Sequence, residues 1–511
     1  MKTKKCVLFI VMVCITPILL LFINNTPFLP IQKYKIISSY NLIEKAPTSW
    51  IGNGIAICTA SNTQRYPQIC SNGSDGAIMV WEDTRNGNYD IYVQKISSNG
   101  TIHWDQDGVP ICTDNDDQYD PRICSDGAGG AIITWRDWRG VSSDVYVQRI
   151  AANGTVMWTG NGTPICTEFN SQTAPEICSD GEGGAIIVWD DSRSATNWDI
   201  YAQRINSSGE IYWAVNGTPI CTQGDPQFRN QICSDGVAGA IIVWEDGRGS
   251  NPYDIYAQKI NSSGHSQWTA DGTAISTAED DQLVPKVLSD GEGGAIFTWH
   301  DRRSSVFDIY AQKINSSEVL LWDGNGTAIC TVGGGQSSPR ICSDGAGGAI
   351  IGWYDVRNGV FNADVYAQKI NGSGNIEWDV NGIGICTSDE DQLNRQISSD
   401  GDGGAVLTWQ DYRNNNDYNI YVQWISSPGV IQWDVNGEPI CMATNDQEYP
   451  QICKDGNNSV IIVWQDFRNG NYDIFVQRVL LTPSSPTNNF LELLILILSI
   501  YLNIQVSNDL N

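Results

Sequence analysis

The chain has 511 residues, 41% of them apolar and 17% charged, a balance that excludes both a highly charged disordered chain and a polytopic membrane protein. Asp and Glu outnumber Lys and Arg by 58 to 30, and the resulting net charge of −28 would repel a nucleic acid and excludes it as a partner. Three histidines give little material for a histidine-ligated metal site, and we expect neither a metal nor a cofactor.

The N-terminus carries a charged Met-Lys-Thr-Lys-Lys stretch followed by an apolar run from Cys6 to Ile23. A charged segment before a hydrophobic core is typical of an export signal. We assign residues 1–30 to a signal peptide or, because no small-x-small cleavage site follows cleanly, to an uncleaved N-terminal anchor. Residues 31–47 are then a linker. Both interpretations predict an extracellular protein, either secreted or held at the cell surface.

Residues 48–481 repeat, with successive copies spaced by 54–56 residues (Trp50 to Trp104 is 54, Trp322 to Trp378 is 56). Each copy contains three boxes in fixed order. A Trp-x-x-x-Gly box begins at Trp50, Trp104, Trp158, Trp213, Trp268, Trp322, Trp378 and Trp433. A Trp-x-Asp-x-Arg box begins at Trp81, Trp135, Trp189, Trp244, Trp299, Trp353, Trp409 and Trp464. A third box, usually Asp-Ile-Tyr-x-Gln, begins at Asp90, Asp144, Asp199, Asp254, Asp308, Asp364, Asn419 and Asp473.

Each copy also contains four short runs rich in β-branched and aromatic residues, separated by Asp-Gly or Asn-Gly turns. In the second copy the runs are residues 122–125, 130–135, 144–150 and 155–158. Four strands per unit and eight units predict an all-β, eight-bladed β-propeller of four-stranded antiparallel blades. A β-solenoid is the competing repeat fold, but its coils are usually shorter. The chain enters at the last strand of a unit (Trp50 to Thr59) and leaves after the third (Asp473 to Val479), so we expect the N-terminal strand to close the last blade.

The third strand, turn and fourth strand of a unit read Gln-x-Ile-x-x-x-Gly-x-x-x-Trp, as in Gln203 to Trp213. This pattern resembles a degenerate Asp-box hairpin of sialidase-type propellers and is similar to the tryptophan-docking hairpin of eight-bladed quinoprotein propellers. Residues 50–480 as a whole resemble the secreted Trp-x-Asp-x-Arg repeat propellers of prokaryotes. The resemblance implies the architecture and no particular activity.

The Trp-x-Asp-x-Arg box invites a catalytic interpretation, with Asp83 and Arg85 as a carboxylate and a cation. However, a catalytic site needs one asymmetric constellation, and this pair occurs in all eight copies. We interpret it as an ion pair that caps the loop after the strand, with the tryptophan packed between blades.

The Ser-Asp-Gly-x-Gly-Gly segments, such as Ser125 to Gly130, suggest a calcium or phosphate loop. A calcium loop needs several oxygen ligands at alternating positions, and only one Asp is regular here. A phosphate-binding glycine loop needs a helix after it, and the sequence predicts none. We interpret the segment as a tight turn between the first and second strands.

Cysteines occur in pairs twelve residues apart: Cys58/Cys70, Cys112/Cys124, Cys166/Cys178, Cys221/Cys233, Cys330/Cys342 and Cys441/Cys453. The fifth copy loses both members together, to Ser276 and Leu288, which favours a disulfide in each crossover of an exported chain. In the seventh copy Cys386 faces Ser398, which favours buried free thiols. The two alternatives stay open at this stage.

The variable segments of a unit are the crossover to the next blade and the loop between the second and third strands, which emerge on one face of a propeller. Crossovers such as Thr113 to Asp120 and Ala278 to Gln282 are acidic. The loops carry aromatic residues that differ between copies: Trp138, Trp198, Tyr253, Phe307, Phe361, Tyr412 and Phe467. Variation on one face predicts a binding surface there, with Trp138, Trp198 and Tyr412 as ligand-binding residues.

One position of the inner strand changes in charge around the ring: Gln68, Arg122, Glu176, Gln231, Lys286, Arg340, Gln396 and Gln451. We predict that Arg122, Lys286 and Arg340 hold an anionic group near the central entrance and that Glu176 accepts hydrogen bonds from hydroxyls. The alternative is a ring of solvated charges without a ligand.

The C-terminus consists of a Pro/Ser/Asn linker, residues 482–489, and an apolar run, residues 490–506, that we assign as a candidate membrane anchor. A frayed tail or an interfacial helix is the alternative, because the run falls short of the roughly 20 apolar residues of a membrane span. Sequons at Asn99, Asn153, Asn206, Asn216, Asn261 and Asn325 fit a glycosylated surface protein.

These observations together favour a monomeric, non-catalytic extracellular propeller that binds a glycan or a protein on its variable face. The alternatives are a sialidase-like glycoside hydrolase and a quinoprotein-type oxidoreductase. The sequence lacks the Arg-bearing opening motif of the first and the adjacent cysteine pair associated with the second.

Overall fold

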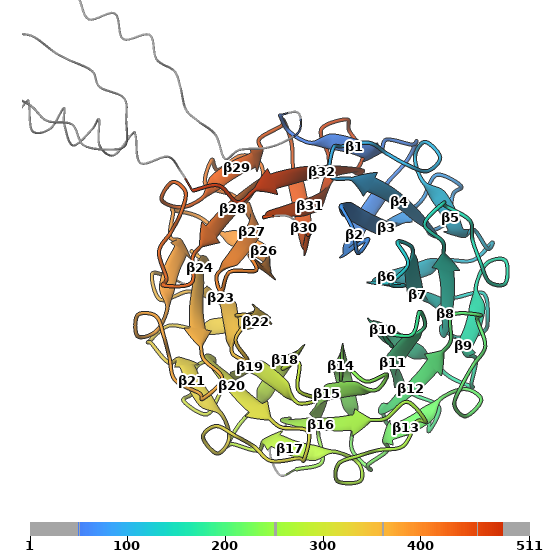
Figure 1. Ribbon diagram of the computed structural model, residues 1–511, viewed down its shortest axis with the longest axis horizontal. Helices are drawn as coiled ribbons and strands as arrows, with labels where there is room; N and C mark the ends of the chain where they lie inside the picture. The colour runs from blue at the N-terminus through green and yellow to red at the C-terminus, as the bar shows by residue number, and fades with distance from the viewer. Residues whose placement is uncertain (1–49, 51, 250–252, 360–361, 457, 484–511) are drawn as a thin grey trace, which may run out of the picture. The chain divides into compact units, whose positions relative to one another are not determined.

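The computed structural model describes residues 50, 52–249, 253–359, 362–456 and 458–483. Thirty-two strands form eight four-stranded antiparallel sheets arranged as the blades of a propeller (Figure 1). Blade 1 is β2–β5, blades 2 to 7 follow in chain order, and blade 8 consists of β30, β31, β32 and β1. The predicted eight-bladed, all-β fold is confirmed.

The innermost strands of blades 1 to 8 are β2 (Gln64–Ser71), β6 (Gln118–Ser125), β10 (Gln172–Ser179), β14 (Gln227–Ser234), β18 (Gln282–Ser289), β22 (Gln336–Ser343), β26 (Gln392–Ser399) and β30 (Gln447–Lys454). The second strands are β3 (Gly76–Asp83), β7 (Ala131–Asp137), β11 (Ala185–Asp191), β15 (Ala240–Asp246), β19 (Ala295–Asp301), β23 (Ala349–Asp355), β27 (Ala405–Asp411) and β31 (Ser459–Asp466).

The third strands are β4 (Asp90–Ser97), β8 (Asp144–Ile150), β12 (Asp199–Ile205), β16 (Asp254–Ile260), β20 (Asp308–Ile314), β24 (Asp364–Ile370), β28 (Asn419–Ile425) and β32 (Asp473–Leu480). The outermost strands are β5 (Val109–Cys112), β9 (Thr163–Cys166), β13 (Thr218–Cys221), β17 (Thr273–Ser276), β21 (Thr327–Cys330), β25 (Ile383–Cys386), β29 (Glu438–Cys441) and, closing blade 8, β1 (Ile55–Cys58).

The ring closes through its first strand. β1 pairs antiparallel with β32, with Ile55 opposite Val476 and Cys58 opposite Ile474. Arg468 of blade 8 reinforces this closure by donating from Nη2 to the carbonyl of Asn53, 2.9 Å away. The predicted use of the N-terminal strand to complete the last blade is therefore confirmed.

The core lies between the blades, where the second strands are buried on both faces. Trp135 of β7 has no exposed surface and packs with Ile78, Val80 and Ile91 of blade 1. The Trp-x-x-x-Gly box serves the same packing, because Gly162 lies directly on the Trp135 indole. A Cβ at Gly162 would be 2.4 Å from Cη2 of Trp135, and the φ of Gly162 is +96°. Both of these recurring features of the repeat unit therefore belong to the core.

One strand assignment from the sequence is wrong. The fourth strand of the second copy was expected at residues 155–158, but the structure places it at Thr163–Cys166. Only a single bridge, between Ile150 and Val156, forms in the expected segment. The side chain of Gln148 explains the delay, because its Oε1 accepts from the Trp158 amide at 2.9 Å and its Nε2 donates to the Thr159 carbonyl at 2.7 Å. The Gln148 side chain thus takes the place of a neighbouring strand for this segment, and continuous backbone pairing with β8 begins only at Thr163.

The disulfide alternative for the cysteine pairs is also wrong: all cysteines of the described residues are free thiols. The first member of a pair ends an outermost strand and meets the arginine of the next blade, as Cys112 does when its Sγ accepts from Nη2 of Arg139 at 3.2 Å. The second member, Cys124, lies on the innermost strand β6. The two thiols thus lie at opposite radial ends of their blades.

The predicted signal peptide or anchor (1–30), the linker (31–47) and the terminal apolar run (490–506) lie outside the described residues. Within the part of the chain that the structure describes, no helix has the length and apolar character to cross a membrane.

Candidate ligand-binding site

The Trp-x-Asp-x-Arg box forms the same buried constellation in every blade. Each tryptophan Nε1 donates to Oδ2 of the box aspartate at 2.7–2.9 Å. Each arginine Nη2 lies 2.5–2.6 Å from the same oxygen. The guanidinium carbon also lies 3.8–4.0 Å from the centre of the ring in the third box, a tyrosine in seven blades and Phe475 in blade 8. The box is a structural ion pair that fixes the loop after the second strand.

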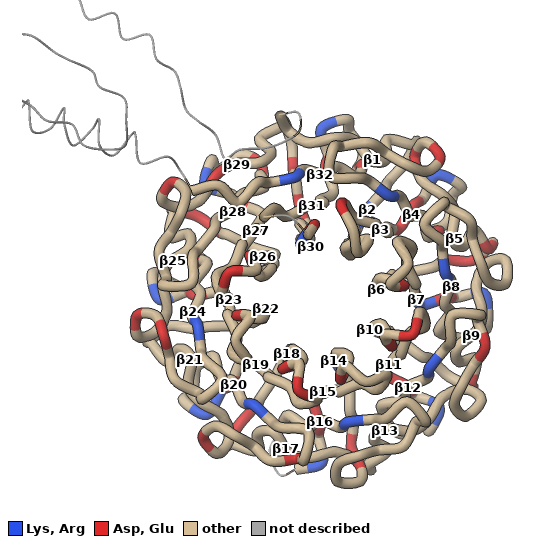
Figure 2. Tube along the Cα trace, viewed as in Figure 1, with Lys and Arg blue, Asp and Glu red and all other residues tan. Residues whose placement is uncertain are grey.

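The face opposite the variable loops is held by a second repeated contact. In blades 2 to 7 the aspartate of the glycine-rich turn caps its own loop, as Asp126 does by accepting the Ala128 and Gly130 amides at 2.8 Å. In several blades its other oxygen meets a cation from the third strand, and Arg149 lies 2.8 Å from Asp126. In blade 7 the partner is Trp424, whose Nε1 donates to Asp400 at 2.9 Å. Figure 2 shows these third-strand cations recurring around the ring. The glycine-rich segments are turns, as predicted, and their acidic residue already has a partner.

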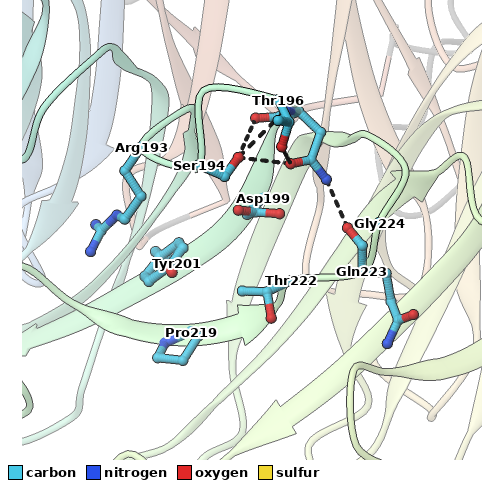
Figure 3. Close-up of a pocket in the computed structure, with 10 residues that line it drawn as sticks. Arg193, Ser194, Thr196, Asp199, Tyr201, Pro219, Thr222, Gln223 and Gly224 are labelled. Atoms are coloured by element: carbon cyan, nitrogen blue, oxygen red, sulfur yellow. Dashed lines mark hydrogen bonds between the residues drawn. The ribbon is translucent and has the colours of Figure 1, made fainter.

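The variable face, formed by the second-to-third-strand loops and the crossovers between blades, contains a pocket of about 480 Å³ in blade 3 (Figure 3). One wall is the loop from Arg193 to Asn197, and another is the crossover from Thr222 to Gly224. Asn197 ties the walls together by donating from Nδ2 to the Gln223 carbonyl at 2.7 Å. Hydroxyls, amides and one carboxylate, from Asp199, line the pocket together with Tyr201, and the Arg193 guanidinium lies 3.8 Å from the centre of the Tyr201 ring.

The carboxyl of Asp199 is nearly buried at the base of this pocket. Burial, together with the nearby Asp191, raises the pKa of Asp199 to about 6. The group is therefore charged at neutral pH but gains from any ligand that donates a hydrogen bond to it. Equivalent aspartates occupy this position in six further blades, and Asn419 replaces them in blade 7.

The aromatic residues predicted to bind a ligand all lie in loops of the variable face, in three different blades. Trp138 is 40% exposed. Trp198 is half-buried, and its carbonyl accepts from the amide of Gln227 of the next blade. The ring of Tyr412 is half-buried against Tyr418, with 4.9 Å between ring centres. Trp138 is therefore the most accessible of the three.

The four charged residues predicted as ligand-binding lie on the inner strands and belong to a belt around the central axis. Arg122 Nε donates to Glu176 Oε1 at 3.0 Å. Gln231 Nε2 donates to the same oxygen at 3.2 Å, and Lys286 Nζ donates to Gln231 Oε1 at 2.8 Å. Arg340 Nε donates to Gln396 Oε1 at 3.2 Å. The structure thus joins Arg122, Glu176 and Lys286 in one chain of contacts and places Arg340 in a separate one.

The belt cations differ in whether a carboxylate offsets their charge. Arg122 and Glu176 form an ion pair whose side chains are 32% and 22% exposed. Burial, together with the charge of Arg340, lowers the pKa of Lys286 to about 7. Burial also lowers the pKa of Arg340. Glu176, predicted to accept hydrogen bonds from ligand hydroxyls, thus already accepts from Arg122 and Gln231 at its Oε1.

A ring of interblade acceptors escaped the sequence analysis. The middle residue of the Trp-x-Asp segment accepts a backbone N–H from the inner strand of the next blade in seven blades, over 2.7–3.1 Å. These brace residues are Glu82, Asp190, Glu245, His300, Tyr354, Gln410 and Gln465. These residues are of five different types and share only a side-chain atom that can accept a hydrogen bond. Aligning the repeat copies by residue type therefore does not reveal them.

Two brace residues titrate unusually because they are buried. Burial raises the pKa of Asp190 to about 7 and lowers that of His300 to about 4. Such shifts also mark catalytic acids and bases. Here, however, Asp190 already accepts from the Arg229 amide and from Asn230, and His300 Nδ1 accepts from the Ser338 amide. We assign both to bracing. Among the described residues, no group of three or more His, Cys, Asp or Glu side chains is placed to hold a metal ion.

No family model matches this chain, and no curated protein matches it. Solved structures that resemble it include an α-L-arabinofuranosidase of Fusarium graminearum bound to arabinobiose, at 11% identity and a TM-score of 0.36 over 84% of this chain and 98% of that one. An α-L-arabinanase of Penicillium chrysogenum bound to arabinobiose matches at 12% identity and 0.35, over 61% and 93%. A eukaryotic initiation factor matches at 8% identity and 0.43, over 86% and 93%. At this level, the blade count and strand order rest on the strand pairing of this chain itself.

Proposed function

We propose that this protein is a non-catalytic extracellular propeller that binds a glycan on its variable face. The observation that carries the proposal is the blade 3 pocket, which is lined by the side chains of Ser194, Asn197, Thr222 and Asp199 (Figure 3). A sugar offers many hydroxyls, and it suits a site that gathers hydrogen-bonding groups in this way. The exposed indole of Trp138 in the neighbouring blade adds a stacking surface on the same face.

The non-catalytic part of the proposal follows from how the polar groups are used. The arginine and aspartate of each Trp-x-Asp-x-Arg box bind one another, and the buried carboxylates of the brace residues accept backbone amides. The pocket's Arg193 is held in this way by Asp191. A hydrolase or a dehydrogenase needs an asymmetric set of reactive groups in one place, and the eightfold repeated contacts offer none. The extracellular location rests on the export-type N-terminus.

A glycan array probed with the full-length protein tests this function. Binding to a defined set of glycans is expected, with at least a tenfold loss for Asn197→Ala and Trp138→Ala. The matched control is Tyr212→Ala, which removes an aromatic side chain that is 58% exposed outside the variable-face loops and should bind as the wild type does. Absence of binding to every glycan, or equal losses in all three variants, would sink the proposal.

A further inference from the structure

The inner strands of blades 5, 6 and 7 carry an unbalanced positive charge. β18, β22 and β26 contain Lys286, Arg340 and Arg395 and no Asp or Glu. We call these three side chains the basic sector. The brace residues of the same blades are neutral at pH 7, namely His300, Tyr354 and Gln410, whereas blades 1, 3 and 4 place Glu82, Asp190 and Glu245 there. In a chain of net charge −28, this sector is an exception.

The partners of the basic sector are neutral. Arg340 donates from Nε to Gln396 Oε1 and from Nη1 to the Pro339 carbonyl, 3.3 Å away. Lys286 donates to Gln231 Oε1. Arg122, at the equivalent belt position of blade 2, has Glu176 as a counter-ion. The contrast is that Arg122 contacts a carboxylate directly, whereas the side-chain contacts of Lys286 and Arg340 are to neutral groups. The charges of Glu176 and Glu245 act on Lys286 only from a distance.

Arg395 adds to the excess of positive charge, because it is a buried cation without an anionic partner among the described residues. It is only 2% exposed, and its Nε has no hydrogen-bond partner within the described residues. Its guanidinium carbon lies 3.7 Å from the ring centre of Tyr354, and its Nη2 donates to the Ser337 carbonyl at 3.4 Å. Six of the eight blades have proline at this position. A buried arginine normally requires a paired charge.

We infer that the basic sector is a binding site for a doubly charged oxyanion, a sulfate or phosphate group, held at the central axis by Lys286 and Arg340 with Arg395 behind them. A guanidinium presents a planar fork of N–H donors that matches a tetrahedral oxyanion, and a lysine ammonium adds a point charge. Both belt side chains are half-buried, so solvent reaches them. The site lies apart from the blade 3 pocket and goes beyond glycan binding on the variable face.

The test is isothermal titration of the full-length protein with sodium sulfate at pH 6, against sodium chloride of equal ionic strength. We expect one sulfate per chain and at least a tenfold weaker affinity for Arg340→Gln and for Lys286→Gln. Arg340→Lys, which keeps the charge, should retain part of the affinity. Arg302→Gln is the matched control, because it removes the same charge from an exposed loop residue of blade 5 and should bind sulfate within twofold of the wild type.

A parallel titration with glucose 6-sulfate and with glucose distinguishes a free anion from a sulfated ligand. Tighter binding of the sulfated sugar than of sulfate, lost in Arg340→Gln, assigns the site to a sulfate group on a larger ligand, and the reverse order assigns it to the free ion. The inference is overturned if the wild type binds no sulfate, or if Arg340→Gln and Arg302→Gln bind it equally. Neither result depends on whether the glycan array gives a signal.

Discussion

Asp137 and Asp144 lie opposite each other across the antiparallel pair β7–β8, and both are buried. Arg139 donates two hydrogen bonds to Asp137, from Nε to Oδ1 at 2.8 Å and from Nη2 to Oδ2 at 2.6 Å. Asp144 occupies the neighbouring position in a less favourable environment, where burial and the charge of Asp137 raise its pKa to about 6. The ionised carboxylate of Asp137 therefore stabilises the blade, whereas ionisation of Asp144 at neutral pH costs stability.

Replacing Asp137 by Asn should strongly destabilise the propeller. The substitution leaves the Arg139 guanidinium with only the more distant carboxylate of Asp114, 3.9 Å away, and weakens the contact with Trp135 Nε1. We expect the free energy of unfolding to fall by about 2–4 kcal/mol, measured by chemical denaturation at pH 7.5. A loss below about 0.5 kcal/mol would show that the repeated ion pair contributes no more than a surface salt bridge.

Replacing Asp144 by Asn should have the opposite sign. Because the pKa of Asp144 is higher in the folded than in the unfolded chain, its contribution to stability declines as pH rises from about 4 to about 6. The neutral amide removes the cost of the buried charge, and Asn419 shows that the fold accepts it. At pH 7.5 we expect the variant to be about 1–2 kcal/mol more stable, and at pH 4 the difference should disappear. A variant less stable than the wild type at both values contradicts this account.

The fold could be predicted because the eight copies align with one another, and their alignment shows where each blade begins and ends. Eight copies of Trp-x-Asp-x-Arg fix the second strand of each blade, and the missing fourth strand of the last copy, with a spare one at the N-terminus, predicts the closing contact of β1 with β32. The position of the fourth strand could not be read in the same way. Residues 155–158 have strand-like composition, and only the side-chain contacts of Gln148 show why pairing begins at Thr163.

The candidate site could be predicted only in part. Loop variation predicts that Trp138 and Tyr412 lie in loops of the variable face, where the structure has them, and their part in binding stays a prediction. The charge differences at Arg122, Lys286 and Arg340 mark the belt. The sequence could not reveal that Glu176 neutralises Arg122, since these residues belong to different blades. It also gave no reason to single out Arg395, whose significance depends on burial between blades and on its contact with Tyr354.

The closing strand can be tested with one buried side chain. Ile57 of β1 packs in the same cluster as Trp81, Ile474 and Val476 and is almost fully buried. Ile57→Ala should lower the free energy of unfolding by about 2–4 kcal/mol. Ile111→Ala, at the equivalent position of blade 1, is the matched comparison and should give a loss within about 1 kcal/mol of it. A loss for Ile57→Ala near zero with a normal loss for Ile111→Ala would mean that β1 contributes little to closing the ring.

The cysteines should behave as protected thiols. Burial raises the pKa of Cys58, Cys112 and Cys166 to about 12, so the reactive thiolate is rare at pH 8. We expect the native protein to resist alkylation by iodoacetamide and to take up the label at these positions once denatured without reductant. Peptide mass mapping identifies the labelled sites. Recovery of Cys112 linked to Cys124 in the unreduced sample would restore the disulfide interpretation.

Sulfate binding at the basic sector should weaken as pH rises through 7. The pKa of Lys286 is about 7 in the unliganded protein, so the side chain is mostly charged at pH 6 and mostly neutral at pH 8.5, whereas sulfate remains a dianion throughout. The charged groups that act on Lys286 are Arg340, Glu176, Arg122 and Glu245. Since a bound anion favours the ammonium form, we expect an affinity about tenfold higher at pH 6 than at pH 8.5. Lys286→Gln should lose this dependence. If the variant retains it in full, the titrating group is another one, for example Asp190, whose pKa burial raises to about 7, and not the lysine.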